Sequence, residues 1–149
     1  MIVQYKLTAD GGQPYQVLEG FKFEGGQAII DGWYIGTLMG EKLDVALELC
    51  KDYQMSEASL DIRKILLVNK VSDLSFSERE TELPEYKLVN AALGVYSEAE
   101  KTAILDKVKA YRNEYYRVKE LAENALDLKE LDSIVITFPS NKTARPDQL

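Results

Sequence analysis

The sequence contains no histidine and a single cysteine, Cys50. Histidine is the commonest general base and the commonest transition-metal ligand, so its absence excludes Ser-His-Asp and Cys-His sites in their usual form. One cysteine can neither form an internal disulfide nor build a structural zinc site. The chain also lacks a GxxxxGK[ST] phosphate loop and an EF-hand loop. We therefore predict no catalytic, cofactor-binding or metal-binding residue.

Long apolar runs and an excess of positive charge are missing as well. No stretch approaches the roughly 18 apolar residues of a membrane span, and no charged start followed by an apolar run marks a signal peptide. The net charge is −7, from 18 basic and 25 acidic residues, which opposes attraction to nucleic acid or to an anionic membrane. We expect no membrane association, no direct nucleic-acid binding and a cytoplasmic location.

Glycine is nearly confined to residues 1–40, which hold eight of the nine glycines. Short apolar runs between glycines are typical of strands joined by tight turns. Region 1–40 is therefore predicted to be β-rich, with strands near Ile2–Thr8, Tyr15–Leu18, Phe21–Glu24, Gln27–Asp31 and Trp33–Thr37. Gly25 and Gly26 are predicted to form a two-residue hairpin turn, because such turns favour residues that tolerate positive φ.

An acidic residue followed by Gly-Gly-Gln occurs twice, at Asp10–Gln13 and at Glu24–Gln27. The triplet resembles the motif of peptide-release factors, which hydrolyse peptidyl-tRNA and carry a basic tail for ribosomal RNA. Here the segment from Ser97 onward has nine basic and ten acidic residues. We interpret both triplets as turns at the corners of a sheet.

After Glu41 the apolar period approaches 3.6. Leu43, Ala46, Leu47 and Cys50 then share one face of a predicted helix of about twelve residues. Residues 57–71 fit a helix or a strand, and we favour a helix that begins near Ser56. Residues 73–85 are predicted to be an exposed loop or an edge strand, and a short helix then starts at Pro84 and stops at Gly94.

The best-specified element is a long helix over about 97–126. Ser97 and Glu100 form a capping box, and no glycine or proline follows until after Leu126. Apolar residues alternate at spacings of four and three along this helix, at Ile104, Val108, Tyr111, Tyr115, Val118, Ala122 and Ala125. Such a helix is roughly 45 Å long. This seam therefore either packs across the core of its own domain or contacts a helical partner, including a second copy of the chain.

The end of the sequence indicates one late strand, Ile134–Phe138, stopped by Pro139. Pairing with the N-terminal sheet is one option for this strand. Residues 139–149 are predicted to be a mobile tail. The expected fold class is α+β. It combines a small N-terminal antiparallel sheet from residues 1–40 with a helical region, 41–138, that contains the long helix and the late strand.

Two groups of residues are candidates for protein contact. The first group lies on the long helix, where tyrosines cluster, because aromatic side chains are enriched at interfaces. It comprises Val108, Tyr111, Tyr115, Tyr116 and Val118. The second group comprises Glu78, Glu80 and Glu82, at alternate positions in "SERETE". On a strand these carboxylates would form a row that mimics DNA phosphates.

The last third of the chain, "YRNEYYRVKELAENALDLKELDSIVITFP", resembles the helix, turn and strand that end small accessory proteins encoded among phage and prophage tail genes. The resemblance implies a non-catalytic structural or assembly role, in the cytoplasm or within a virion, and it transfers no functional residue. The main alternative is an acidic inhibitor of a nucleic-acid enzyme, of the anti-restriction or anti-CRISPR type. A third is a small enzyme that uses carboxylates or tyrosine.

Overall fold

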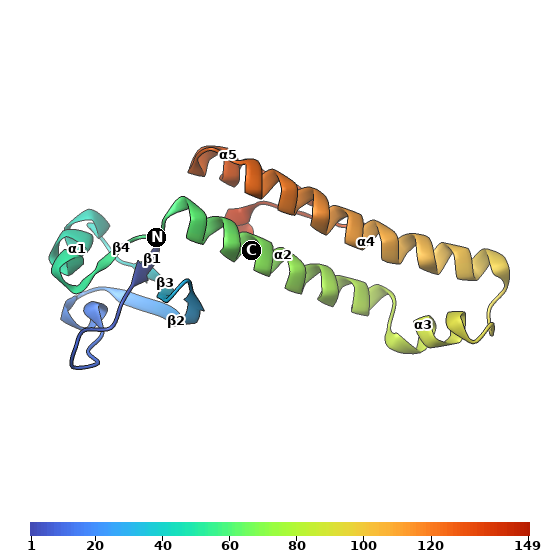
Figure 1. Ribbon diagram of the computed structural model, residues 1–149, viewed down its shortest axis with the longest axis horizontal. Coiled ribbons are helices and arrows are strands. Elements are labelled where there is room, and N and C mark those ends of the chain that lie inside the picture. Colours follow the sequence, from blue (N-terminus) through green and yellow to red (C-terminus); the bar gives the residue numbers. More distant parts are fainter. The chain divides into compact units, whose positions relative to one another are not determined.

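A computed structural model describes residues 1–149, apart from the side chains of Gln27 and Ala28. The chain divides into two compact units, Met1–Ile65 and Leu66–Leu149. The first contains an antiparallel sheet and the second is mostly helical, including the expected long helix (Figure 1). The predicted α+β class is therefore confirmed.

The first unit is built on a four-stranded sheet with the order β2-β3-β1-β4, in which all neighbours are antiparallel. Its strands are β1 (Ile2–Tyr5), β2 (Lys22–Ile30), β3 (Trp33–Met39) and β4 (Met55–Glu57). Helix α1 (Leu43–Cys50) adds Ala46 and Cys50 to the buried core, which confirms the predicted apolar face. The helix is shorter than expected and continues as one 3₁₀ turn, Lys51–Tyr53.

The glycine-pair hairpin prediction is wrong. Residues on both sides of Gly25 and Gly26 belong to one strand, β2, whose register with β3 shifts between Gly25 and Ala28. The glycines thus form a β-bulge, where their positive φ angles of 93° and 91° are accommodated. The actual turn is Asp31-Gly32, at φ 50° and 81°, between the paired residues Ile30 and Trp33.

The predicted strand at Tyr15–Leu18 is also wrong, because Pro14–Val17 form a 3₁₀ helix. Proline has no N–H to give to a sheet, and its fixed φ suits the first helical position. The turn places the Tyr15 ring against Phe23 at a centroid distance of 4.1 Å. This segment therefore covers one edge of the core through aromatic packing.

Tyr5 lies at the centre of this aromatic cluster and is 1% exposed. Its ring stacks on Tyr34 at 5.4 Å and meets Tyr15 and Phe23 edge-on. Its hydroxyl lies 2.8 Å from Gln13 Oε1, so the glutamine of the first Gly-Gly-Gln triplet is a structural acceptor. Burial is the main reason that the pKa of Tyr5 rises to about 12. The Gln27 side chain of the second triplet lies outside the described residues.

Helix α2 (Leu60–Glu82) begins in the first unit and extends into the second. The helix favoured for residues 57–71 is confirmed, although it starts at Leu60, where Ser59 Oγ accepts from the Ile62 N–H. The loop or edge strand predicted for 73–85 is wrong as far as Glu82. No glycine or proline interrupts 60–82, and its many Lys, Arg, Glu and Leu residues favour a helix.

The two following helices agree with the predicted start and stop signals. Helix α3 (Glu85–Ala92) follows Pro84 and ends in a Schellman motif, in which the Val95 N–H donates to Asn90 O and Gly94 has φ 74°. Helix α4 (Glu98–Asn124) starts with the predicted capping box. Glu100 N lies 3.2 Å from Ser97 Oγ, and Ser97 N lies 2.9 Å from Glu100 Oε2.

The C-terminal segment, residues 133–149, turns back along the second unit. After α5 (Leu128–Asp132), strand β5 (Ile136–Thr137) pairs with β6 (Thr143–Ala144) and not with the N-terminal sheet. A 3₁₀ turn, Pro146–Gln148, completes the chain within the stretch that we expected to be a tail. The pairing is local because a short turn brings the two strands together at little entropic cost.

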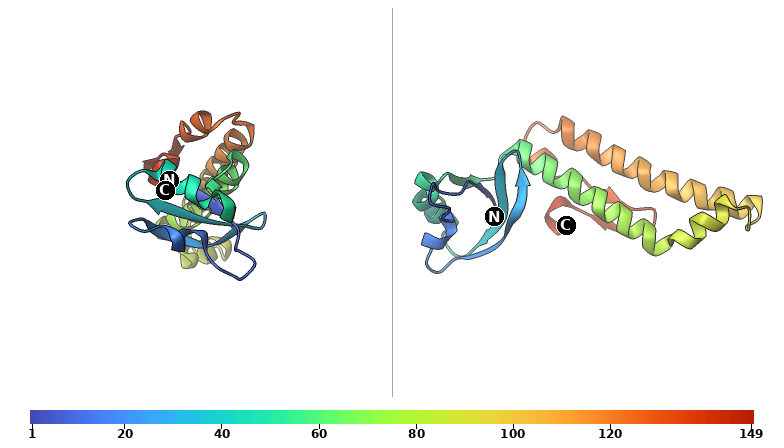
Figure 2. Two further views of the ribbon diagram at one scale, coloured as in Figure 1. Left: turned by 90° about the vertical axis from the view of Figure 1, so that its left-hand side faces the viewer. Right: turned by 60° about the horizontal axis from the view of Figure 1, so that its bottom comes forward.

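Within the second unit, α4 runs antiparallel to the part of α2 that follows Ile65 (Figures 1 and 2). The C-terminal segment lies along one side of the two helices (Figure 2). Its apolar residues Ile134, Ile136 and Phe138 are buried. The helix pair therefore has one side covered by its own chain.

We predict that Gly26→Ala destabilises the first unit more than Gly20→Ala. Both glycines have positive φ, but a Cβ on Gly26 would lie 2.6 Å from Tyr5 Oη, whereas nothing lies within 4 Å of one on Gly20. We expect the excess loss in the free energy of unfolding to be about 1–3 kcal/mol. Urea denaturation followed by the fluorescence of Trp33, the only tryptophan, measures it. Equal losses would show that the bulge has room for a side chain.

Candidate functional site

Glu114 attaches the C-terminal segment to α4. Its Oε1 accepts the Thr137 N–H at 2.7 Å, and its two oxygens also receive the Arg117 guanidinium. Arg117 in turn donates to the Val135 carbonyl at 2.7 Å. Burial acts to raise the pKa of Glu114, but the bonds from Arg117 and Thr137 outweigh it, so this pKa lies below its ordinary value.

Helix α2, the second helix of the pair, contacts the same segment. Lys142 Nζ lies 2.8 Å from Glu78 Oε1, and Lys70 Nζ donates to the Leu149 carbonyl at 2.7 Å. With 3.6 residues per turn, these α2 residues share one side of the helix with buried Val71. The contacts of both helices thus define the covered side of the pair.

The opposite side of the pair carries an open groove, with a cavity of about 210 Å³ between the helices. We call it the α2–α4 groove. Its walls come from two turns of each helix: Ser72, Ser75, Phe76 and Arg79 on α2, and Val108, Tyr111, Arg112 and Tyr115 on α4. Most of the lining surface is apolar, and none of the described residues that line it is a carboxylate.

Two polar atoms of the α2–α4 groove residues have no hydrogen-bond partner among the described residues. They are Ser75 Oγ and Arg79 Nε, both buried, and Ser75 as a whole is only 8% exposed. The Arg79 guanidinium instead lies over the half-exposed Phe76 ring at 5.0 Å from its centroid. Buried polar atoms are nearly always paired, so two unpaired ones on neighbouring turns of α2 make the α2–α4 groove a candidate binding site.

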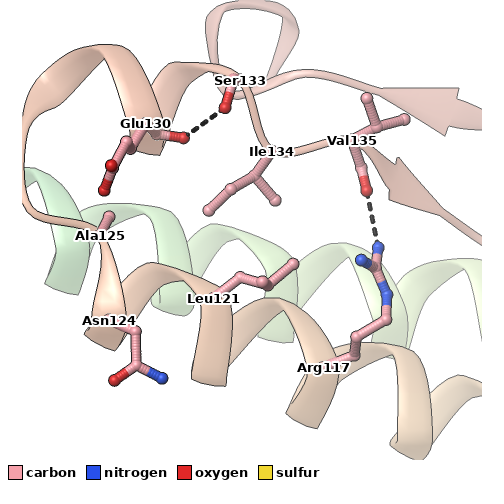
Figure 3. A pocket seen from close by; sticks show the side chains of 8 residues that line it. All are labelled: Arg117, Leu121, Asn124, Ala125, Glu130, Ser133, Ile134 and Val135. Atoms are coloured by element: carbon pink, nitrogen blue, oxygen red, sulfur yellow. Dashed lines mark hydrogen bonds between the residues drawn. The ribbon is translucent and has the colours of Figure 1, made fainter.

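A second, larger cavity of about 410 Å³ lies where the end of α4 meets α5 and the start of the C-terminal segment (Figure 3). Its polar groups already bind one another. Arg117 donates to Val135 O, Ser133 Oγ donates to Glu130 O, and a Glu130 oxygen accepts the Leu126 N–H. This cavity therefore offers a ligand few unused hydrogen bonds, and we regard the α2–α4 groove as the better candidate.

The contact residues predicted on the long helix divide between the groove, the core and solvent. Val108, Tyr111 and Tyr115 line the α2–α4 groove. The Tyr111 hydroxyl donates to Glu82 at 2.6 Å, and burial is the main cause of its raised pKa. Val118 is fully buried, whereas Tyr116 is 55% exposed and meets Tyr115 edge-on.

The three alternating glutamates do not form a row, because they lie on a helix. Glu78 and Glu82 are one turn apart on one side of α2, and Glu80 points elsewhere and is exposed. Glu78 binds Lys142, and Glu82 binds Tyr111 and Lys107. The strand on which the phosphate-like row depended is therefore absent from these residues, and two of the three carboxylates already have cationic partners.

The sequence pattern did not predict the α2 wall of the groove. Ser72, Ser75, Phe76 and Arg79 fall in or beside the stretch predicted as a loop or edge strand. A signal was available, since Leu67, Val71 and Leu74 are spaced by four and three, and no glycine or proline separates Ser56 from Leu83. The many glutamates of this stretch favoured an exposed loop or edge strand, although the apolar residues have helical spacing.

An exposed apolar surface also occurs on α3. Tyr86, Val89 and Leu93 lie one turn apart on its outer side and are 61%, 46% and 73% exposed. No unpaired buried polar atom lies among them. This surface is therefore less specified chemically than the α2–α4 groove.

Among the described residues, no cluster of acids and Cys50 has the arrangement of a metal site. Within the same residues, no helix combines the length and apolarity that a membrane crossing requires. Comparison with family models, with curated proteins and with solved structures finds no significant match to this chain.

We predict that Glu114→Gln destabilises the second unit at neutral pH and that the difference shrinks in acid. A carboxyl whose pKa is lowered by folding stabilises the fold above its ordinary pKa, near 4.5, and loses that contribution as the pH falls through the lowered value. We expect a loss of about 1–3 kcal/mol at pH 7. Urea denaturation followed by far-ultraviolet circular dichroism at several pH values measures it.

Glu120→Gln is the matched control, because Glu120 is an exposed carboxyl on the same helix. We expect its stability to follow that of the unchanged protein at every pH. A Glu114→Gln difference that stays constant down to pH 3 would contradict a titrating contact.

Proposed function

We propose that the chain is a non-catalytic interaction or assembly protein that binds a segment of a partner protein in the α2–α4 groove. One observation carries the proposal: the helix pair is covered on one side only, and the other side keeps an apolar groove with unpaired buried polar atoms. Each such atom costs the fold about 1–3 kcal/mol. A feature that lowers the stability of the fold without improving another contact within it is typical of a binding surface.

The size of the groove sets the length of the partner segment. Its α2 wall runs from Ser72 to Arg79, two helical turns or roughly 10 Å. That length matches two turns of a helix laid into a groove, a common mode of peptide recognition. Phe76 and Tyr115 supply the aromatic contacts that usually dominate the affinity of such interfaces.

The resemblance of residues 111–139 to phage tail accessory proteins favours a partner within a phage or other mobile-element particle. Association through the seam of the long helix is a less direct route. Tyr111, Val118 and Ala122 are buried within their own unit, so a second chain would have to displace that packing first. We therefore place the partner contact on the open side of the pair.

The two alternative functions receive less support from the geometry. A DNA mimic requires a continuous acidic surface, but Glu78 and Glu82 contact Lys142 and Lys107. An enzyme requires an activated base or nucleophile in its cleft. The described groove lining has serine and tyrosine but no carboxylate or histidine, and the raised pKa of Tyr111 disfavours the anionic form that would act as a base. We propose neither.

Selection from a random peptide library displayed on phage tests the proposal. We expect peptides that bind the intact protein and lose about tenfold or more in affinity towards Phe76→Ala, because a half-exposed aromatic anchor contributes to binding more than to folding. Fluorescence anisotropy of the resynthesised peptides measures the affinity.

Tyr86→Ala is the control, since Tyr86 is an aromatic residue on α3 that is at least as exposed as Phe76 and does not line the groove. We expect it to bind the peptides with unchanged affinity. Failure to enrich any peptide, or peptides that respond to Tyr86→Ala and not to Phe76→Ala, would reject the α2–α4 groove as the binding surface.

A further inference from the structure

Resting on the proposed function, we infer that the α2–α4 groove recognises a carboxylate side chain, aspartate or glutamate, flanked by apolar residues of the partner protein. The chemistry of the unpaired groups points to this ligand. Ser75 Oγ–H and Arg79 Nε–H are both donors, and both lack acceptors among the described residues. A carboxylate is the protein side chain that accepts from arginine through two parallel bonds.

The charge of the groove agrees with an acidic ligand. Arg79 lies on one wall and Arg112 on the other, and neither makes an ion pair with the described residues. Nearby cations of the same unit are already neutralised, Lys107 by Glu82 and Arg117 by Glu114. The groove is therefore a locally basic site on a protein whose net charge is −7.

The volume favours a side chain over a free small molecule. A cavity of about 210 Å³ is smaller than the roughly 300–1,000 Å³ of ordinary ligand pockets. A single carboxylate side chain fits it and leaves Phe76, Val108 and Tyr115 to contact the apolar neighbours of that residue. The occupant is thus one acidic residue with its flanking apolar residues.

A second copy of the chain fits the groove poorly. A two-fold contact places the same surface of both copies together, so Arg79 and Arg112 of one copy would face the same arginines of the other. Like charges brought together at an interface oppose association. The occupant is therefore a different protein, and self-association through this face is an outcome that would overturn the inference.

A carboxylate probe tests the chemistry without a known partner. The Arg79 Nε–H resonance, assigned by its loss in Arg79→Lys, is followed by nuclear magnetic resonance while 4-methylpentanoate is added to millimolar concentration. We expect this resonance to shift with the acid and to remain unchanged with 4-methylpentanamide, which has the same shape and no charge. Equal shifts, or no shift, would overturn the inference.

Selected peptides give a second, independent measurement. Replacing the peptide's acid by its amide and Arg79 by glutamine should each weaken binding about tenfold or more, and the two changes together should cost no more than either alone. Arg145→Gln, an exposed arginine away from the groove, is the matched control and should bind normally. Additive losses would show that Arg79 and the acid do not meet.

Ser75→Ala separates a binding role from a structural one. Removing an unpaired buried hydroxyl should raise the urea midpoint of the second unit while it weakens peptide binding. Lower stability would instead assign Ser75 a structural partner.

The proposed function and the inference fail in different ways. Peptides that lose affinity towards Phe76→Ala but carry no acid would leave the α2–α4 groove as a binding surface and reject only the carboxylate.

Discussion

The arrangement of the second unit depends on the contact between Glu114 and the chain that follows α4. One carboxylate holds the Thr137 N–H and the Arg117 guanidinium, and Arg117 also holds the Val135 carbonyl. These bonds keep the C-terminal segment on one side of α2 and α4, where its apolar residues complete the core. Because the segment covers only that side, the other side of the helix pair stays open.

That asymmetry explains why the groove exists. Two helices alone bury only the strip of surface between them, and a third element is needed on each side to fill the spaces that flank it. The chain supplies one such element, β5 with the residues around it. On the uncovered side, Phe76 remains 53% exposed and Ser75 and Arg79 keep unpaired atoms, which a partner segment would cover in the same way.

Charge is distributed unevenly over the same helices. The acidic residues of α2 that face the covered side bind lysines, as Glu78 does with Lys142. Arg79 and Arg112 lie on the open side, and no acidic residue is among the described residues that line the groove with them. A protein that is acidic overall thus carries two arginines in one apolar groove.

Local signals predicted the local structure well. The capping box at Ser97, the stop at Gly94 and the apolar face of α1 were all predicted and are all observed, because each depends on residues within a few positions of one another. The errors arose where two local readings compete. Gly25 and Gly26 fit a turn or a bulge equally well, and Asp31-Gly32 took the turn because it places Ile30 opposite Trp33 in register.

The candidate site could be predicted only in part. Val108, Tyr111 and Tyr115 follow from the spacing of the long helix. The apolar spacing of α2 predicts a helix that contains Ser75 and Arg79, but their burial and missing partners depend on packed neighbours and have no local signal.

By itself, the sequence determined the α+β class, the long helix with its start and its seam, and the lack of histidine chemistry. Only the tertiary structure decided which side of the helices is covered, because that choice depends on contacts between residues more than twenty positions apart, such as Glu114 with Thr137.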